Sequence, residues 1–88
     1  MPTVNGGSVQ QDADHDNYAA VTTATATNVN DWVLVLKNPP VKHNYAIGDH
    51  LTYNSRGTHN PNADNQLVVT SVVGPGKYKC TGNYPINT

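Results

Sequence analysis

The residues best suited to bind a metal form a short acidic segment near the N-terminus. Asp12, Asp14 and Asp16 alternate with other residues, which is the spacing that opens an EF-hand calcium loop. Two later positions depart from that loop, because Asn17 replaces its glycine and Thr23 replaces its bidentate glutamate. Without that glutamate and without flanking helices, the segment is interpreted as a solvated acidic turn.

Histidines are the second candidate for metal binding. The chain has four of them in 88 residues, but no two have the spacing of local metal ligands. It also has no glutamate and a single cysteine, so a ligand set would need a distant residue. We therefore expect surface or loop histidines, no metal and no cofactor; the four are His15, His43, His50 and His59.

The sequence offers no convincing nucleophile. Cys80 has Lys79 beside it, and a nearby cation lowers a thiol pKa. Neighbours on a strand point to opposite faces, however, so Lys79 should not reach Cys80, and Asp49 should not reach His50. No serine lies in a nucleophile elbow, and no glycine-rich phosphate loop is present. We expect a protein that is not an enzyme.

Charge also excludes partner classes. Five lysines and arginines against six aspartates give a net charge of −1, and the cations are scattered. Nucleic-acid binders and membrane-surface binders cluster their basic residues, so neither partner is expected. No segment approaches a membrane span of about 20 apolar residues. The N-terminus also lacks the basic and apolar regions of a signal peptide.

The first 17 residues are predicted to form a flexible or docking arm. They are polar, and they contain Gly6-Gly7 as a hinge. The remaining residues, 18–88, are predicted to form a single β domain. We expect the arm and the start of the domain to bind a partner through sparse apolar anchors, namely Val4, Val9, Tyr18 and Val21.

Several segments of the domain are predicted to be strands. Residues 18–27 are small and β-branched, which favours an edge strand or extended arm. Residues 32–36 form a short apolar run, typical of a strand buried on both faces, which Pro39-Pro40 ends. Residues 47–53 alternate, with Ile47, Leu51 and Tyr53 on one face.

The strongest local signal is the turn Gly74-Pro75-Gly76-Lys77. Proline followed by glycine fits a type II turn, which predicts an antiparallel hairpin over residues 67–80. The segment 54–65 is predicted to be a long loop, and long loops in small domains are often functional. Its candidate contact residues are Arg56, His59, Asn62 and Asp64.

These segments predict an all-β protein: a small antiparallel barrel or sandwich of four to six short strands with an extended N-terminal arm. The run IGDHLTY, followed by a loop and then QLVVTSVVGPGKYKC, resembles the pattern of SH3-like and OB-like barrels. A core this small usually needs an additional source of stability, such as a disulfide, a metal or a partner subunit. The single cysteine cannot form an internal disulfide. We therefore expect oligomerisation or docking on a larger body.

In composition the chain resembles the small decoration, or cement, proteins of tailed bacteriophage heads. The resemblance is to short, Asn/Thr/Ala/Val-rich chains with a β-rich body and an N-terminal arm. It implies a structural protein of the virion that bridges coat subunits of a capsid, as a homo-oligomer (dimer or trimer). The alternative is a small glycan- or ligand-binding β module of a virion or cell surface. An OB-like nucleic-acid binder is the least favoured of the three functions.

Overall fold

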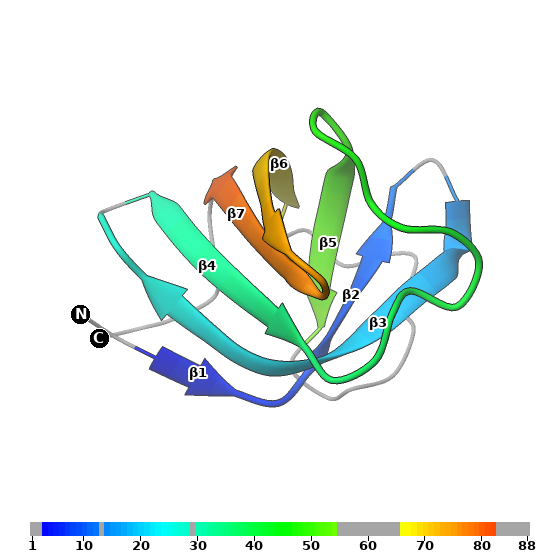
Figure 1. Cartoon of the computed structure of the whole chain (residues 1–88), viewed down its shortest axis with the longest axis horizontal. Helices are drawn as coiled ribbons and strands as arrows, with labels where there is room; N and C mark the ends of the chain where they lie inside the picture. Colours follow the sequence, from blue (N-terminus) through cyan, green and yellow to red (C-terminus); the bar gives the residue numbers. More distant parts are fainter. Residues whose placement is uncertain (1–2, 13, 29, 55–65, 83–88) are drawn as a thin grey trace.

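The structure is a computed structural model, and it describes residues 3–12, 14–28, 30–54 and 66–82. Regular structure in these ranges consists of seven strands and no helix, as Figure 1 shows. The strands are β1 (Thr3–Asn5), β2 (Ser8–Gln11), β3 (Asp14–Ala26), β4 (Asp31–Leu36), β5 (His50–Asn54), β6 (Gln66–Gly74) and β7 (Lys77–Gly82).

Six of the strands close into an antiparallel barrel. The sheet order is β1-β3-β2-β5-β6-β7-β4, and a further pairing of β3 with β4 closes the ring. The seventh strand, β1, adds to the outside of this ring by pairing with β3. The prediction of an all-β protein with a small antiparallel barrel is therefore confirmed.

The long strand β3 makes the closure possible because it serves three partners. On one edge it pairs first with β2, at Ala20 opposite Ser8, and then with β1, at Ala24 opposite Val4. On its other edge it pairs with β4. Residues 18–26 of the predicted segment 18–27 are thus in a strand, but the expected edge position is wrong because both edges of β3 are occupied.

A pair of glycines separates β1 from β2. Gly6 and Gly7 both have φ of 82°, a region that side chains other than glycine's rarely adopt. The backbone N–H of Gly6 donates to Thr22 O (3.0 Å), and Gly7 O accepts from the N–H of Val21 (2.9 Å). Both glycines therefore stay on β3 between β1 and β2, which pair with successive parts of the same strand, and beyond them β2 also pairs with β5 on its other edge.

The described part of the predicted N-terminal arm belongs to the sheet. β2 lies between β3 and β5 and pairs with both. Its Val9 is completely buried, with 0% exposure. These residues find partners that are distant in sequence, and the division into a flexible or docking arm and a domain stays a prediction.

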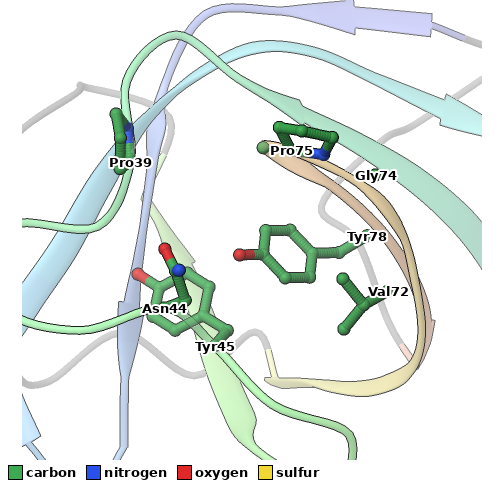
Figure 2. A pocket seen from close by; sticks show the side chains of 8 residues that line it. Pro39, Asn44, Tyr45, Val72, Gly74, Pro75 and Tyr78 are labelled. Atoms are coloured by element: carbon green, nitrogen blue, oxygen red, sulfur yellow. The ribbon is translucent and has the colours of Figure 1, made fainter.

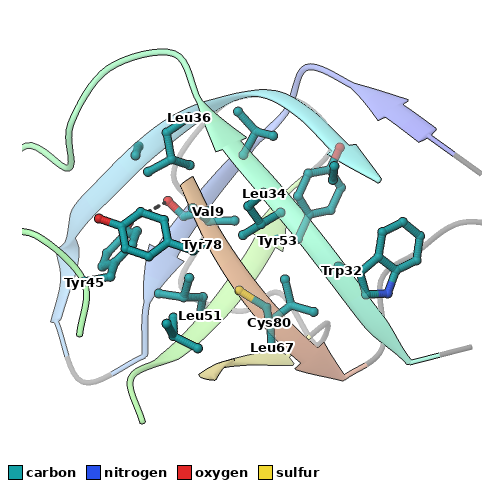
Figure 3. Packing of buried hydrophobic residues seen from close by; sticks show 14 of the residues in the cluster. Val9, Trp32, Leu34, Leu36, Tyr45, Leu51, Tyr53, Leu67, Tyr78 and Cys80 are labelled. Atoms are coloured by element: carbon teal, nitrogen blue, oxygen red, sulfur yellow. Dashed lines mark hydrogen bonds between the residues drawn. The ribbon is translucent and has the colours of Figure 1, made fainter. Parts of the chain in front are cut away.

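The barrel interior is filled by one apolar cluster, shown in Figure 3. Leu51 and Tyr53 of β5 point inward as predicted, whereas Ile47 precedes the strand and is exposed. In β4 the burial alternates, so the prediction of a strand buried on both faces is wrong: its outer face lies on the outside of the barrel. The cluster comprises Val9, Ala19, Val21, Ala24, Ala26, Trp32, Leu34, Leu36, Tyr45, Leu51, Tyr53, Leu67, Val69, Tyr78 and Cys80.

The hairpin of β6 and β7 is confirmed. The two strands pair from Leu67 opposite Gly82 to Gly74 opposite Lys77. Gly76 has φ of 66°, as the third position of a type II turn requires. Its carbonyl accepts from the N–H of Leu36 (2.8 Å), which fastens the turn to the end of β4.

The glycine pair provides a matched test of this fold. A Cβ at Gly6 would meet no atom within 4 Å, whereas one at Gly7 would lie 2.3 Å from the Tyr53 hydroxyl oxygen. We expect Gly6→Ala to cost about 1–2 kcal/mol in unfolding free energy, from backbone strain alone. Gly7→Ala should cost about 1–3 kcal/mol more, because a buried ring must also move. Urea unfolding followed by circular dichroism measures both, and equal losses would contradict the described packing.

Candidate functional site

The strand β1 presents an open edge. Within the part of the chain that the structure describes, β1 pairs with β3 alone. Val4 lies opposite Ala24, and the N–H of Gly6 donates to Thr22 O, so the backbone groups of Val4 face β3. Alternation along the strand then turns the N–H and C=O groups of Thr3 and Asn5 away from β3. Such a row of unpaired groups is a template for another strand.

The outer face beside this edge carries uncharged rows, and the nearest charge on β4 is Asp31, two residues before Val33 on the same face. The Thr3 hydroxyl donates to the Thr25 hydroxyl oxygen (3.4 Å), and these threonines continue a row across the sheet. Two such rows run over β1, β3 and β4 before they reach a lysine on β7. They are Thr3, Thr25, Val33 and Lys79, and Asn5, Thr23, Val35 and Lys77.

The four residues predicted to anchor a partner do not form one surface. Val9 and Val21 are core residues with 0% and 3% exposure, so their side chains are not accessible to a partner in the folded barrel. Val4 is partly buried against the same core, and Tyr18 is 41% exposed on β3. The sequence does not separate the two roles, because an apolar residue in a polar segment has the same sequence pattern whether it binds a partner or packs in the core.

The candidate contacts predicted in the long loop lie outside the described residues. They are Arg56, His59, Asn62 and Asp64.

The predicted acidic turn differs from the structure, because Asp14 and Asp16 lie in strand β3, and its carboxylates make contacts within the chain. Asp14 forms an ion pair with Lys42 and accepts a hydrogen bond from the backbone N–H of Asp16 (3.2 Å). Its hydrogen bond with Lys42 holds the pKa of Asp14 below its usual value. The Thr52 hydroxyl donates to the Asp12 carboxylate. Over the described ranges, no three His, Cys, Asp or Glu side chains are placed to hold a metal ion.

Asn17 fastens the connection between β4 and β5 to the barrel. Its side chain is completely buried, and its Nδ2 donates to His43 O (2.9 Å) and to Gln11 Oε1 (3.0 Å). Its Oδ1 accepts from the backbone N–H of Lys42 (3.1 Å). A buried amide is expected to have its hydrogen bonds satisfied, and this one joins three segments. Sequence reasoning missed it, because an asparagine in a polar segment gives no sign of burial.

Two tyrosine rings complete the same region. The Tyr45 hydroxyl donates to Asn17 O (3.0 Å), and its ring lies 5.7 Å from that of Tyr78 at a tilt of 58°. Burial raises the pKa of both hydroxyls above their usual value. A cleft of about 320 Å³ opens beside the rings, between the β4–β5 connection and the β6–β7 turn (Figure 2).

Cys80 is a core residue rather than a nucleophile. Its side chain is 1% exposed, and burial raises the pKa of the thiol to about 12. Lys79 is exposed, as the alternation of the strand predicts, and so lies on the other face of β7. A thiol that stays protonated at neutral pH is chemically inert.

Comparison of the chain with protein-family models, with curated proteins and with solved structures found no match. The described ranges contain no helix long and apolar enough to cross a membrane. Function must therefore be argued from the geometry of the barrel and its surface.

The buried thiol predicts how stability depends on pH. In the unfolded chain it ionises near 9.0, its ordinary value, but in the folded protein it holds its proton until about pH 12. Its contribution to stability is therefore complete below pH 9 and is lost as the pH rises toward 12. The slope for this group is at most about 1.4 kcal/mol per pH unit.

We expect urea unfolding between pH 7 and 11 to show a shallower alkaline decline for Cys80→Ala than for the wild type. The buried tyrosines produce the decline that remains. Parallel curves for the two proteins would contradict the burial of this thiol.

Proposed function

We propose that this chain is a non-enzymatic structural protein that attaches to a larger protein assembly by strand addition through β1. The observation that carries the proposal is that, among the described residues, β1 pairs with β3 alone and leaves its other edge open, while the six strands of the barrel form a closed ring. Closing a barrel removes sheet edges altogether, so one additional strand outside the ring supplies an edge that the ring does not need.

The composition of β1 favours this role. β1 is short, which by itself limits pairing along its edge, but the described segment, Thr3, Val4 and Asn5, carries no lysine, proline or inward-pointing charge. β-branched and uncharged residues on the neighbouring ends of β3 and β4 extend the same surface. An extended segment of a partner would find hydrogen-bonding groups at the edge and no charge to desolvate beside them.

The energetics favour a repeated assembly over a single tight complex. Thr3 and Asn5 together offer about four backbone hydrogen bonds, each with a net contribution of about 0.5–1.5 kcal/mol. One such contact is weak once the cost of association is subtracted. Many identical contacts on a lattice, or several within a homo-oligomer, raise the effective concentration and make attachment stable.

The specific role that fits these features is that of a virion decoration protein. It would sit on the capsid surface as a dimer or trimer and bridge coat subunits through β1, adding buried surface at their joints. The small size, the near-neutral charge and the Asn/Thr/Ala-rich composition support this role. The role is mechanical and needs no cofactor.

A proline substitution tests the edge without disturbing the barrel. Asn5→Pro removes an N–H that faces away from β3, and edge strands accept proline where the missing N–H faces solvent. We expect wild-type protein to co-sediment in a density gradient with capsids assembled from the coat protein encoded in the same genome. Asn5→Pro should bind about 10-fold or more weakly, because a partner carbonyl loses its donor.

The matched control is Asn5→Ala, which removes the side chain but keeps the N–H, and it should bind like the wild type. Thermal unfolding should show that both variants remain folded. The proposal fails if wild-type protein neither co-sediments with capsids nor forms oligomers in light scattering, or if Asn5→Pro binds as well as Asn5→Ala.

A further inference from the structure

The cleft beside Tyr45 and Tyr78 continues into a second depression. Besides the two rings, the cleft is lined by Pro39, Asn44, Val72 and the turn Gly74-Pro75-Gly76. The adjoining depression, of about 180 Å³, is lined by Leu36, Lys37 and Asn38 and shares Pro39, Pro75 and Gly76 with the cleft. We call the two together the proline trough. None of its lining residues belongs to β1.

Both walls of the trough are fixed before any ligand arrives. One wall carries Pro75 in a turn whose Gly76 carbonyl accepts from the N–H of Leu36. The other wall is the β4–β5 connection, held by the buried Asn17 side chain and by the Tyr45 hydroxyl. A preformed site avoids the entropic cost of ordering loops on binding.

The rim of the trough is apolar and exposed. Pro39 and Pro75 are exposed, and Val72 is 48% exposed. Exposed apolar residues gathered around a cleft indicate a binding surface rather than ordinary scatter.

The polar groups of the trough are suited to binding carbonyl oxygens. The Tyr45 hydroxyl is already used, since it donates to Asn17 O. The Tyr78 hydroxyl points toward Asn44 and Tyr45 in Figure 2, and Tyr78 lines the cleft. A phenolic hydroxyl is able to donate its proton to a carbonyl oxygen of a ligand. The exposed Asn44 amide supplies further donors.

Among the described residues that line the trough, the charged one is Lys37. Lys77 follows Gly76 on the turn, and both lysines are exposed. A ligand with a carboxylate near Lys37 would therefore complement the trough electrostatically.

We propose that the proline trough binds a proline-rich segment of a partner protein, in polyproline II conformation and followed by an acidic residue. This conformation makes no internal hydrogen bonds, so its carbonyls are free for Tyr78 and Asn44. Its rings pack on an apolar wall, and its rigidity keeps the entropic cost of binding low. The carboxylate lies at the end of the trough where Lys37 is. The proposal is independent of the role of β1.

The test uses three capped synthetic peptides in NMR titrations of the whole chain. The first has six prolines followed by two aspartates, the second has lysines in place of the aspartates, and the third has serine and glycine in place of the prolines. We expect saturable shifts of the Asn44, Gly74 and Gly76 amides with the first peptide. Binding of the other two should be about 10-fold weaker or more.

Two substitutions separate the contributions. Lys37→Glu, at an exposed position, should weaken the aspartate peptide about 10-fold and strengthen the lysine peptide. Tyr78→Phe should weaken the aspartate peptide about 3- to 10-fold through loss of one hydrogen bond. Tyr18→Phe, which removes a hydroxyl outside the trough, should leave the affinity unchanged.

Several outcomes would overturn the proposal. These are the absence of saturable shifts with the first peptide, equal binding of the serine-glycine peptide, and affinities insensitive to Lys37→Glu. Shifts of the same amides on dilution of the protein alone would assign the trough to a second copy of the chain. Shifts with a chitin oligosaccharide in place of the peptides would assign it to a glycan. All of these results leave the capsid experiment on β1 unaffected.

Discussion

Closure of the barrel on β3 is the constraint from which the rest of the structure follows. The thirteen residues of β3 pair with β2, β1 and β4. Pairing with all three requires a long, curved strand with small inward-facing side chains. Ala24 and Ala26 have small side chains on the inner face of β3. They leave room in the core for the larger side chains of Trp32 and Leu34 from β4. The glycine pair separates β1 from β2, and both strands pair with β3.

This arrangement gives the molecule two separate surfaces. The edge of β1 offers backbone hydrogen-bonding groups and few side chains that select a partner. It therefore suits an extended partner segment whose sequence is not tightly specified. The proline trough lies between the β4–β5 connection and the β6–β7 turn, and it offers apolar walls with a few placed donors. Because the two surfaces share no residue, the two proposed binding events do not compete for the same side chains.

The sequence predicted what is determined locally. The turn Gly74-Pro75-Gly76 identified the hairpin because its backbone conformation is dictated by its own residues. The Trp32–Leu36 run identified β4 because its β-branched residues favour a strand and the prolines that follow make the run too short for a helix. These two elements, with the alternation around Leu51, were enough to predict a small antiparallel barrel.

The sequence did not predict what depends on distant partners. β2 has one aliphatic residue, Val9, and becomes a strand because β3 and β5 lie on either side of it. The buried amide of Asn17 acts on residues about 25 positions away, so nothing next to it in the sequence indicates its role. The candidate site changed for the same reason, from a flexible arm with anchors to one ordered edge.

The central claim is that β1 is an ordered strand with one edge bonded and one edge open. Amide hydrogen exchange measured residue by residue on the free protein tests it most directly. We predict slow exchange at Val4 and Gly6, whose N–H groups face β3, and fast exchange at Thr3 and Asn5, whose N–H groups face outward. Uniformly fast exchange over these four residues would show a detached arm, and uniformly slow exchange would show an edge that is already covered; either result contradicts the account.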